Sequence, residues 1–180
     1  MRQNYTVFSW IDLWMEVYNK PAVKKGTYES QTYYVKTLKS YIDDIGLSDL
    51  NEITCQRALN RMADDGYAKA TLVKMRTILS KSMRKAAQLG VILINPAQEL
   101  IIPQAYTKEV IPLTSDQEKK VIEACLNIPG ADYLRFMLCT GLRRGEVKNL
   151  EWSDYNWEKQ EIQVRISKTK AGERVLPLTK

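Results

Sequence analysis

Residues 140–154 read TGLRRGEVKNLEWSD and hold the most informative pattern in the chain. The glycine at the second position is expected to end a short buried helix, and another short helix is expected over residues 145–150. Arg143 and Arg144 would then lie at the start of the second helix, where guanidinium groups and exposed backbone N–H groups favour a phosphate oxyanion. Solvated surface charge is the alternative for both arginines. Glu146, one turn after Arg143, could hold its guanidinium in one rotamer or form an ordinary surface pair.

Beyond this stretch the hydrophobic period changes from helical to alternating. Residues 162–166 alternate apolar and polar side chains, and residues 174–178 return as a second strand after the turn sequence TKAG at 169–172. A β-hairpin is therefore predicted, and its basic residues are Lys168, Lys170 and Arg174. A lysine at a hairpin tip can neutralise a DNA phosphate or give a proton to a leaving alkoxide, or it can simply be solvated.

The N-terminal half has the apolar spacing of helices with short connections. Helices are predicted over residues 6–19, 27–45, 54–65 and 69–89. Thr54 is expected to cap the third helix, and Gly46 and Gly66 are expected to end the second and the third. This pattern predicts a compact orthogonal helical bundle that ends near residue 100.

The fourth of these helices carries basic side chains opposite its apolar stripe. The stripe consists of Leu72, Met75, Leu79, Met83 and Ala86. The basic residues are Lys69, Lys74, Arg76, Lys81, Arg84 and Lys85. No acidic residue lies between Lys69 and Arg84, whereas solvated helix faces normally mix both signs. The helix therefore predicts a surface that follows DNA phosphates, with an ordinary solvated face as the alternative. Four further lysines could extend it: Lys24, Lys25, Lys36 and Lys39.

The segment between the two halves reads as a linker. Residues 101–113 contain two prolines and no periodic pattern long enough for a helix or a strand. The predicted organisation is a helical domain over 1–100, this linker, and a second domain over 114–180. In the second domain, helices are expected from residue 114 or 115 to about residue 127, and over the apolar residues 133–139.

Composition excludes several kinds of chemistry. The 180 residues include 27 Lys and Arg, 21 Asp and Glu, and no histidine, so Ser-His-Asp triads, Cys-His pairs and histidine metal sites are excluded within the chain. The net charge of +6 is compatible with a polyanionic partner. Three widely separated cysteines predict a reducing cytoplasm, and the lack of a signal peptide or a long apolar span predicts no membrane insertion.

Together these motifs resemble the tyrosine recombinase, or phage integrase, family. Residues 140–154 are similar to its first conserved box, Thr-Gly-x-Arg-x-x-Glu-x-x-x-Leu-x-Trp-x-Asp, and residues 169–178 to its Thr-Lys-x-Gly…Arg-x-x-Pro-Leu hairpin. Residues 94–97 (INPA) resemble the end of the family's core-binding domain. The resemblance implies a mainly α fold: a four-helix SAM-like core-binding bundle, a linker, and the start of an α+β recombinase catalytic domain with a β-hairpin.

The resemblance also implies roles for individual residues. Arg143 would hold the scissile phosphate and stabilise the pentavalent transition state, and Glu146 would support the active site. Lys170 would protonate the leaving 5′-oxygen, although Lys168 is close enough that a one-turn shift could exchange the two. Arg174 would stabilise the hairpin or contact backbone phosphate. No cofactor or metal is implied.

Other parts of the family pattern are absent from these 180 residues. The family needs a downstream His-x-x-Arg box, a further His or Trp, and a tyrosine that forms a 3′-phosphotyrosyl bond. The ten tyrosines here are expected to be packing residues, so this chain alone is expected to be inactive. The implied partner is double-stranded DNA with att or core-type sites, together with self-association on DNA in the full-length protein.

Two functions therefore remain open. The first is site-specific recombination or integration by a tyrosine recombinase of which this chain is a part. The second is a catalytically inactive, truncated recombinase that acts only as a DNA-binding module. An unrelated helical regulator of the helix-turn-helix kind would leave the hairpin motif unexplained.

Overall fold

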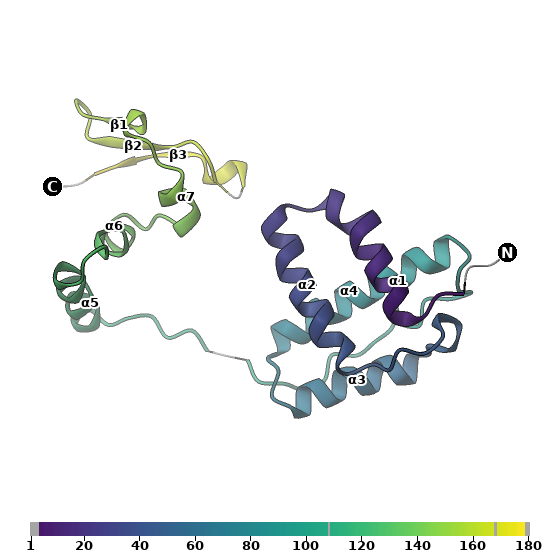
Figure 1. Ribbon diagram of the computed structural model, residues 1–180. Coiled ribbons are helices and arrows are strands. Elements are labelled where there is room, and N and C mark those ends of the chain that lie inside the picture. Colours follow the sequence, from purple (N-terminus) through teal and green to yellow (C-terminus); the bar gives the residue numbers. More distant parts are fainter. Residues whose placement is uncertain (1–3, 108, 168, 179–180) are drawn as a thin grey trace. The chain divides into compact units, whose positions relative to one another are not determined.

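The computed structural model describes residues 4–107, 109–167 and 169–178. The chain divides into two compact units, Met1–Glu109 and Val110–Lys180 (Figure 1). The first unit is helical, and the second combines three helices with a small antiparallel sheet. Within the described residues, no helix is both long enough and apolar enough to cross a membrane. The mainly helical fold agrees with the sequence-based prediction.

The first unit is built around one long central helix. Its helices are α1 (Val7–Trp14), a π-helical turn (Met15–Asn19), 3-10 turns (Lys20–Ala22 and Leu47–Asp49), α2 (Lys25–Lys39), α3 (Glu52–Asp64) and α4 (Lys69–Gln88). Helix α4 packs against α1, α2 and α3 (Figure 1). The predicted stripe on α4, from Leu72 to Ala86, is fully buried, which confirms the helical period read from the sequence.

The second predicted helix ends earlier than its apolar residues suggested. Helix α2 stops at Lys39 and not at Ile45, although Ile42 is buried in the core. The backbone after α2 instead pairs with the start of α1: the Val7 N–H donates to the Ile45 carbonyl at 2.9 Å. The Asp44 carboxylate also accepts one N–H of the first turn of α1, that of Phe8, at 2.9 Å. These long-range bonds replace the helical ones.

The cap of the third helix also differs from the prediction. Asn51, not Thr54, is the N-cap of α3, and the Thr54 N–H donates to the Asn51 side-chain oxygen at 3.0 Å. Both residue types are good caps, so the sequence alone allowed either position. Helix α3 consequently begins two residues before Thr54, at Glu52.

The first part of the predicted linker lies on the first unit. The Gln56 amide exchanges two hydrogen bonds with the backbone of Ile101, at 2.8 and 2.9 Å. The Lys69 N–H donates to the Tyr106 carbonyl at 3.0 Å, at the start of α4. Residues 101–106 therefore belong to the helical unit, because Gln56 and α4 satisfy their backbone groups.

The second unit has few buried side chains. It contains α5 (Ser115–Asn127), α6 (Asp132–Thr140), α7 (Arg144–Lys148) and strands β1 (Tyr155–Asn156), β2 (Glu161–Val164) and β3 (Arg174–Pro177). The strands form an antiparallel sheet in the order β1-β2-β3, with Ile162 opposite Leu176. Its buried apolar residues, among those described, are Cys125, Ala131, Leu142, Ile162 and Val164.

Two features of this unit differ from the prediction. The short strand β1 was not predicted, because two residues are too few to show alternation. Helix α6 was predicted to be buried, but none of its residues, all of which are described, is buried. Helix α6 packs against α5 and α7, and Phe136 and Met137 are only half-buried. Leu134 and Leu138 are exposed.

Candidate functional site

The candidate site begins where α6 ends. Gly141 adopts a left-handed conformation (φ +65°), and its N–H donates to the Met137 carbonyl at 2.9 Å. A residue with a Cβ would be strained there, so glycine suits this reversal. Leu142 then anchors the chain in the interior, and Arg143 precedes α7 in extended conformation. The reversal places the Arg143 side chain at the surface while its neighbour is buried.

Glu146 is the centre of a hydrogen-bond network. Its carboxylate is 3% exposed and accepts four hydrogen bonds. Two come from Arg143, through the backbone N–H at 3.0 Å and Nη1 at 2.9 Å. The others come from the Ser167 hydroxyl at 2.7 Å and Arg174 Nη2 at 3.3 Å. A buried carboxylate is stable only when paired in this way, so Glu146 holds three parts of the unit together.

The network changes one detail of the sequence-based interpretation. Exposed backbone N–H groups were expected at this helix start. The Arg143 N–H is instead occupied by Glu146, and α7 is only five residues long. The Arg143 N–H is therefore not available to a phosphate. Arg144, beside it, is exposed, and its side chain makes no hydrogen bond or ion pair with another described residue.

Arg143 is held on one side and open on the other. Its side chain is 66% exposed although Nη1 is bound to Glu146. It borders a depression of about 380 Å³, lined by Gly141, Arg143, Thr169, Ala171, Gly172 and Arg174. Among the described residues, two arginines and no carboxylate or tyrosine line this depression, so it is suited to an anion such as a phosphodiester.

The hairpin lysines are placed differently. Lys170 is exposed in the 3-10 turn Lys170–Gly172 and does not line the depression, although both residues that follow it do. Lys168 lies outside the described residues. Arg174 donates to the Gly172 carbonyl at 2.8 Å as well as to Glu146, so it braces the hairpin. The choice between Lys170 and Lys168 as proton donor therefore stays a prediction.

Ser167 is a member of the network that sequence reasoning did not single out. It lies three residues after β2 and reaches Glu146 from 21 positions away in the chain. A serine in a hairpin carries no local signal of such a contact. A second ion pair was also missed: Arg165 Nη2 donates to Asp154 at 3.1 Å and to Glu151 at 2.9 Å. Arg165 lowers the pKa of Asp154 and fixes the end of the 140–154 motif against β2.

The predicted DNA-binding residues of α4 fall into two groups. Lys69, Lys81 and Arg84 are exposed, and their charged groups make no ion pair with a described residue. The other three contact their own unit: Lys74 donates to the Tyr34 hydroxyl at 3.0 Å, Lys85 lies 4.7 Å from the Tyr18 ring centre, and Arg76 donates to the Leu100 carbonyl at 3.1 Å. Lys69, Lys81 and Arg84 are therefore the most available cations on this helix.

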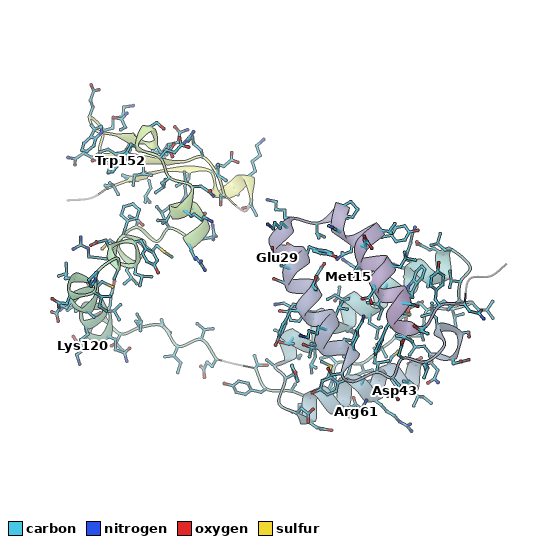
Figure 2. The ribbon with its side chains drawn as sticks, viewed as in Figure 1. Met15, Glu29, Asp43, Arg61, Lys120 and Trp152 are labelled. Atoms are coloured by element: carbon cyan, nitrogen blue, oxygen red, sulfur yellow. The ribbon has the colours of Figure 1, made fainter. Side chains whose placement is uncertain are left out.

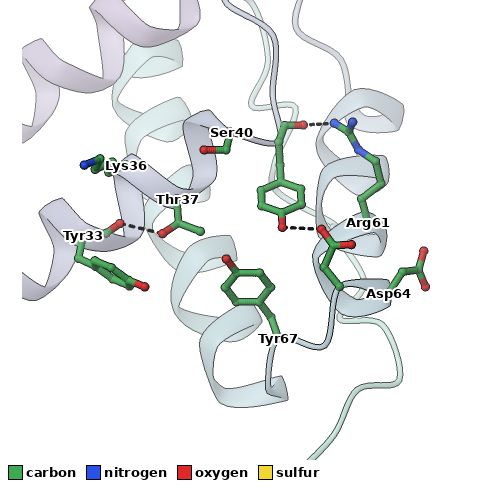
Figure 3. A pocket seen from close by; sticks show the side chains of 9 residues that line it. Tyr33, Lys36, Thr37, Ser40, Arg61, Asp64 and Tyr67 are labelled. Carbon is green, nitrogen blue, oxygen red and sulfur yellow. Dashed lines mark hydrogen bonds between the residues drawn. The ribbon is translucent and has the colours of Figure 1, made fainter.

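Two larger cavities lie elsewhere. Figure 3 shows one of about 790 Å³ between α2 and α3, where Tyr33, Lys36, Arg61 and Asp64 line the wall. Hydrogen bonds join some of its lining residues: the Tyr41 hydroxyl donates to Asp65 at 2.6 Å, which raises the pKa of Tyr41, and the Arg61 guanidinium donates to the Tyr41 carbonyl. Among the described residues no cluster of His, Cys, Asp or Glu could hold a metal ion. Lys36 and Asp64 also line this cavity and are exposed.

The second cavity, of about 580 Å³, is apolar and lies in the second unit. Phe136, Val147, Leu150 and Ile162 contribute to its lining, and Trp152 stands at its edge with 84% of its surface exposed (Figure 2). It carries no reactive group near Arg143. The candidate site therefore remains the depression beside Arg143.

The pKa of Glu146 gives a testable pH dependence. The Arg143 N–H, followed by the Ser167 hydroxyl, holds this pKa at about 2, against an ordinary value of 4.5. Because the folded pKa is lowered, the ionised carboxylate stabilises the unit above pH 4.5, and this contribution is lost as the pH falls toward about 2. A ¹³C-carboxylate NMR titration is expected to show Glu146 still ionised at about pH 3. Arg174→Gln should raise the midpoint, and a wild-type midpoint of about 4 or more would contradict the network.

Comparisons with known proteins identify the family of both units. The model of the phage integrase family matches residues 112–180, and that of the phage integrase N-terminal SAM-like domain matches residues 6–63. The tyrosine recombinase XerC-like protein of Caldanaerobacter subterraneus subsp. tengcongensis is 29% identical over 139 residues, covering 73% of this chain and 35% of that protein. The integrase of Escherichia phage lambda is 28% identical over 153 residues, covering 83% of this chain and 42% of that protein.

A solved structure extends the similarity to the fold. A lambda integrase tetramer bound to a Holliday junction has a TM-score of 0.79 and 26% identity, covering 96% of this chain and 50% of that chain. This chain thus corresponds to 35–42% of the length of the two curated relatives. Because family models match residues 112–180 of the second unit and residues 6–63 of the first, the chain belongs to the phage integrase family of tyrosine recombinases.

Proposed function

We propose that this chain is the DNA-binding portion and the first catalytic portion of an enzyme for site-specific DNA recombination or integration. The observation that carries the proposal is the Arg143 guanidinium, which the buried Glu146 holds in place while 66% of the Arg143 side chain stays exposed. A charged donor that is fixed before the reaction can stabilise charge as it develops on phosphorus, without the energy of reorganising.

In the proposed reaction Arg143 holds the scissile phosphate. A tyrosine oxygen supplied from outside these 180 residues attacks the phosphorus, the bond to the 5′-oxygen breaks, and a 3′-phosphotyrosyl bond forms. Lys170, or Lys168 in its place, gives the proton to the leaving oxygen. The bond energy is retained in the phosphotyrosine, so rejoining requires no nucleotide, and the proposal includes no metal.

Double-stranded DNA is the proposed partner. The exposed cations of α4, with Arg174 and Lys168 of the hairpin, would contact phosphates at core-type or att sites. The lambda integrase tetramer bound to a Holliday junction supports both DNA binding and self-association of the complete protein. A cytoplasmic location is part of the proposal and is supported by Cys55, Cys125 and Cys139, which are all free thiols.

The α4 surface predicts salt-dependent binding. Replacing Lys81 and Arg84 together with alanine should weaken duplex binding and lower the slope of log K against log salt by about 0.9 for each DNA phosphate that the variant no longer neutralises. Fluorescence anisotropy with a short duplex between about 50 and 200 mM salt measures both quantities. Arg57→Ala, an exposed arginine on α3, is the matched control. An unchanged slope in the double variant would remove α4 from the DNA surface.

The decisive test of the proposed function starts from the coding DNA. A reading frame that continues beyond Lys180, with a His-x-x-Arg box and a later tyrosine, supports the recombinase. Protein from that frame should then form an adduct with its DNA that survives detergent and is removed by protease. A stop codon after Lys180, with duplex binding retained, would leave a DNA-binding module without chemistry.

A further inference from the structure

We propose that Ser167 is a positioning residue, which couples the β2–β3 hairpin to Arg143 through Glu146, and that Gly172 provides the close surface on which this coupling depends. The proposal rests on the proposed function for the role of Arg143 in holding the scissile phosphate. The contacts between Ser167, Glu146 and Arg143 can be tested without a recombination assay. Ser167 touches no substrate in this scheme. It acts on the phosphate-holding group through one carboxylate.

One oxygen atom joins the hairpin to the arginine. Oε1 of Glu146 accepts both from Arg143 Nη1, at 2.9 Å, and from the Ser167 hydroxyl, at 2.7 Å. The two donors come from different elements, the start of α7 and the segment after β2. Because they share one acceptor, the orientation of the carboxylate, and with it that of the guanidinium, depends on where the hairpin lies.

The space around the serine is closed by Gly172. A Cβ at Gly172 would overlap the Ser167 hydroxyl and would lie 2.6 Å from the Ser167 Cβ and 3.7 Å from Arg143 Nη1. Contacts below 3.0 Å essentially never occur for real Cβ atoms. Gly172 does not have a positive φ, so glycine is required here for close approach and not for backbone conformation.

Arg174 completes the network. The Gly172 carbonyl accepts from Arg174 Nη1 at 2.8 Å, and the same guanidinium donates Nη2 to Glu146 Oε2 at 3.3 Å. The Gly172 N–H donates to the Thr169 carbonyl at 2.9 Å, which forms the turn that carries Lys170. Contacts therefore run from Glu146 through Ser167, Gly172 and Arg174 back to Glu146. One carboxylate, that of Glu146, therefore fixes two positions: that of the turn that carries Lys170, the proposed proton donor, and that of Arg143, which would hold the phosphate.

This arrangement predicts the effect of losing a single hydroxyl. Ser167→Ala leaves Oε1 of Glu146 with Arg143 as its one donor among the described groups, in a site where water is largely excluded. The Glu146 carboxylate can then rotate. As a result, the positions of the Arg143 guanidinium and of the Lys170–Gly172 turn are no longer fixed relative to each other. DNA affinity should change little, because Ser167 is half-buried and carries no charge. The rate of strand cleavage should fall on the order of tenfold, the size expected for a lost hydrogen bond to a charged group.

The test uses the 180-residue chain first. In Ser167→Ala, the Glu146 carboxylate should titrate at a higher pH in ¹³C NMR, and the Arg143 Nε–H should exchange faster with water. Ser167→Thr, which keeps the hydroxyl, should restore both signals. Ser153→Ala is the matched control, because that hydroxyl also donates to a carboxylate of this unit, at 3.4 Å. Amide signals of Ile162 and Val164 report whether the sheet is intact.

The outcomes separate the two proposals. If both NMR signals stay at wild-type values in Ser167→Ala with an intact sheet, the coupling is wrong, whatever the enzyme does. If Ser167→Ala unfolds the unit, Gly172→Ala decides. It should shift the same two signals, and combining it with Ser167→Gly, which removes the clash, should give less than the sum of the single effects. If the NMR signals shift but the complete protein forms no DNA adduct, the coupling stands and the proposed function fails.

Discussion

Arg143→Ala is expected to lower strand cleavage by the complete protein by about 10²–10³-fold or more, while duplex affinity falls only a few-fold. The reason is that Arg143 offers the most exposed guanidinium of the candidate site, and Glu146 already holds it in one position. A neutral methyl group cannot stabilise charge that develops on the phosphate. The measurement is a single-turnover assay of the detergent-resistant DNA adduct.

Two variants give this experiment its controls. Arg144→Ala removes an exposed arginine at the adjacent position and should leave cleavage near the wild-type rate. Arg143→Lys keeps the charge but loses the planar fork, so partial activity is expected. Cleavage by Arg143→Ala at the wild-type rate would overturn the assignment of the site. Loss of duplex affinity as large as the loss of rate would instead make Arg143 a binding residue.

The second large effect concerns stability of the helical unit. Trp10→Ala should lower the free energy of unfolding by about 3–5 kcal/mol, the range for truncating a buried aromatic side chain. Trp10 is 1% exposed and lies at the contact between α1 and α4. Its indole N–H donates to the Ser82 carbonyl at 3.1 Å, and its ring packs edge-on against Tyr5 with 5.4 Å between centroids. The substitution leaves a cavity and removes the indole hydrogen bond to α4.

Urea denaturation followed by far-UV circular dichroism measures this effect, because the helices dominate the signal. Trp157→Ala is the matched control: the same side chain is removed, but Trp157 is 71% exposed, so the change should be small. Trp10→Phe should fall between the two, since it keeps most of the apolar contact and loses the N–H. Equal effects of Trp10→Ala and Trp157→Ala would mean that α1 does not pack as described.

The two units differ in how much apolar surface they bury. The helical unit buries a continuous apolar core from Val7 to Leu100, whereas the described part of the second unit buries only a few small clusters. Trp152 and Trp157 are both largely exposed beside an apolar cavity. The effect of a substitution in the helical unit is therefore best measured as a change in the unfolding transition of that unit. Effects at the candidate site are best measured by NMR or by the DNA-adduct assay.

Sequence patterns predicted the parts of the fold that depend on interactions between residues close together in the chain. The stripe on α4 is buried as predicted, because residues three and four apart lie on one face of a helix. The start of α5 was predicted at residue 114 or 115; the helix begins at Ser115, and the hydroxyl of its N-cap, Thr114, accepts the Gln117 N–H at 3.3 Å. The Arg143–Glu146 pair follows from i,i+3 spacing alone. The resemblance of the 140–154 motif supplied the family that the comparisons then supported.

Tertiary structure decided what depends on residues far apart in the chain. Helix α2 ends at Lys39 because the following backbone bonds to the start of α1, which no local pattern around residues 40–45 contains. Glu146 is a buried centre and not a surface partner, because Ser167 and Arg174 reach it from 21 and 28 positions away. Spacing along a helix determines which side chains are neighbours within one turn. Only the packing of α7 against the hairpin removes water from the Glu146 carboxylate. Its ionised form is then stable only because protein groups donate hydrogen bonds to it.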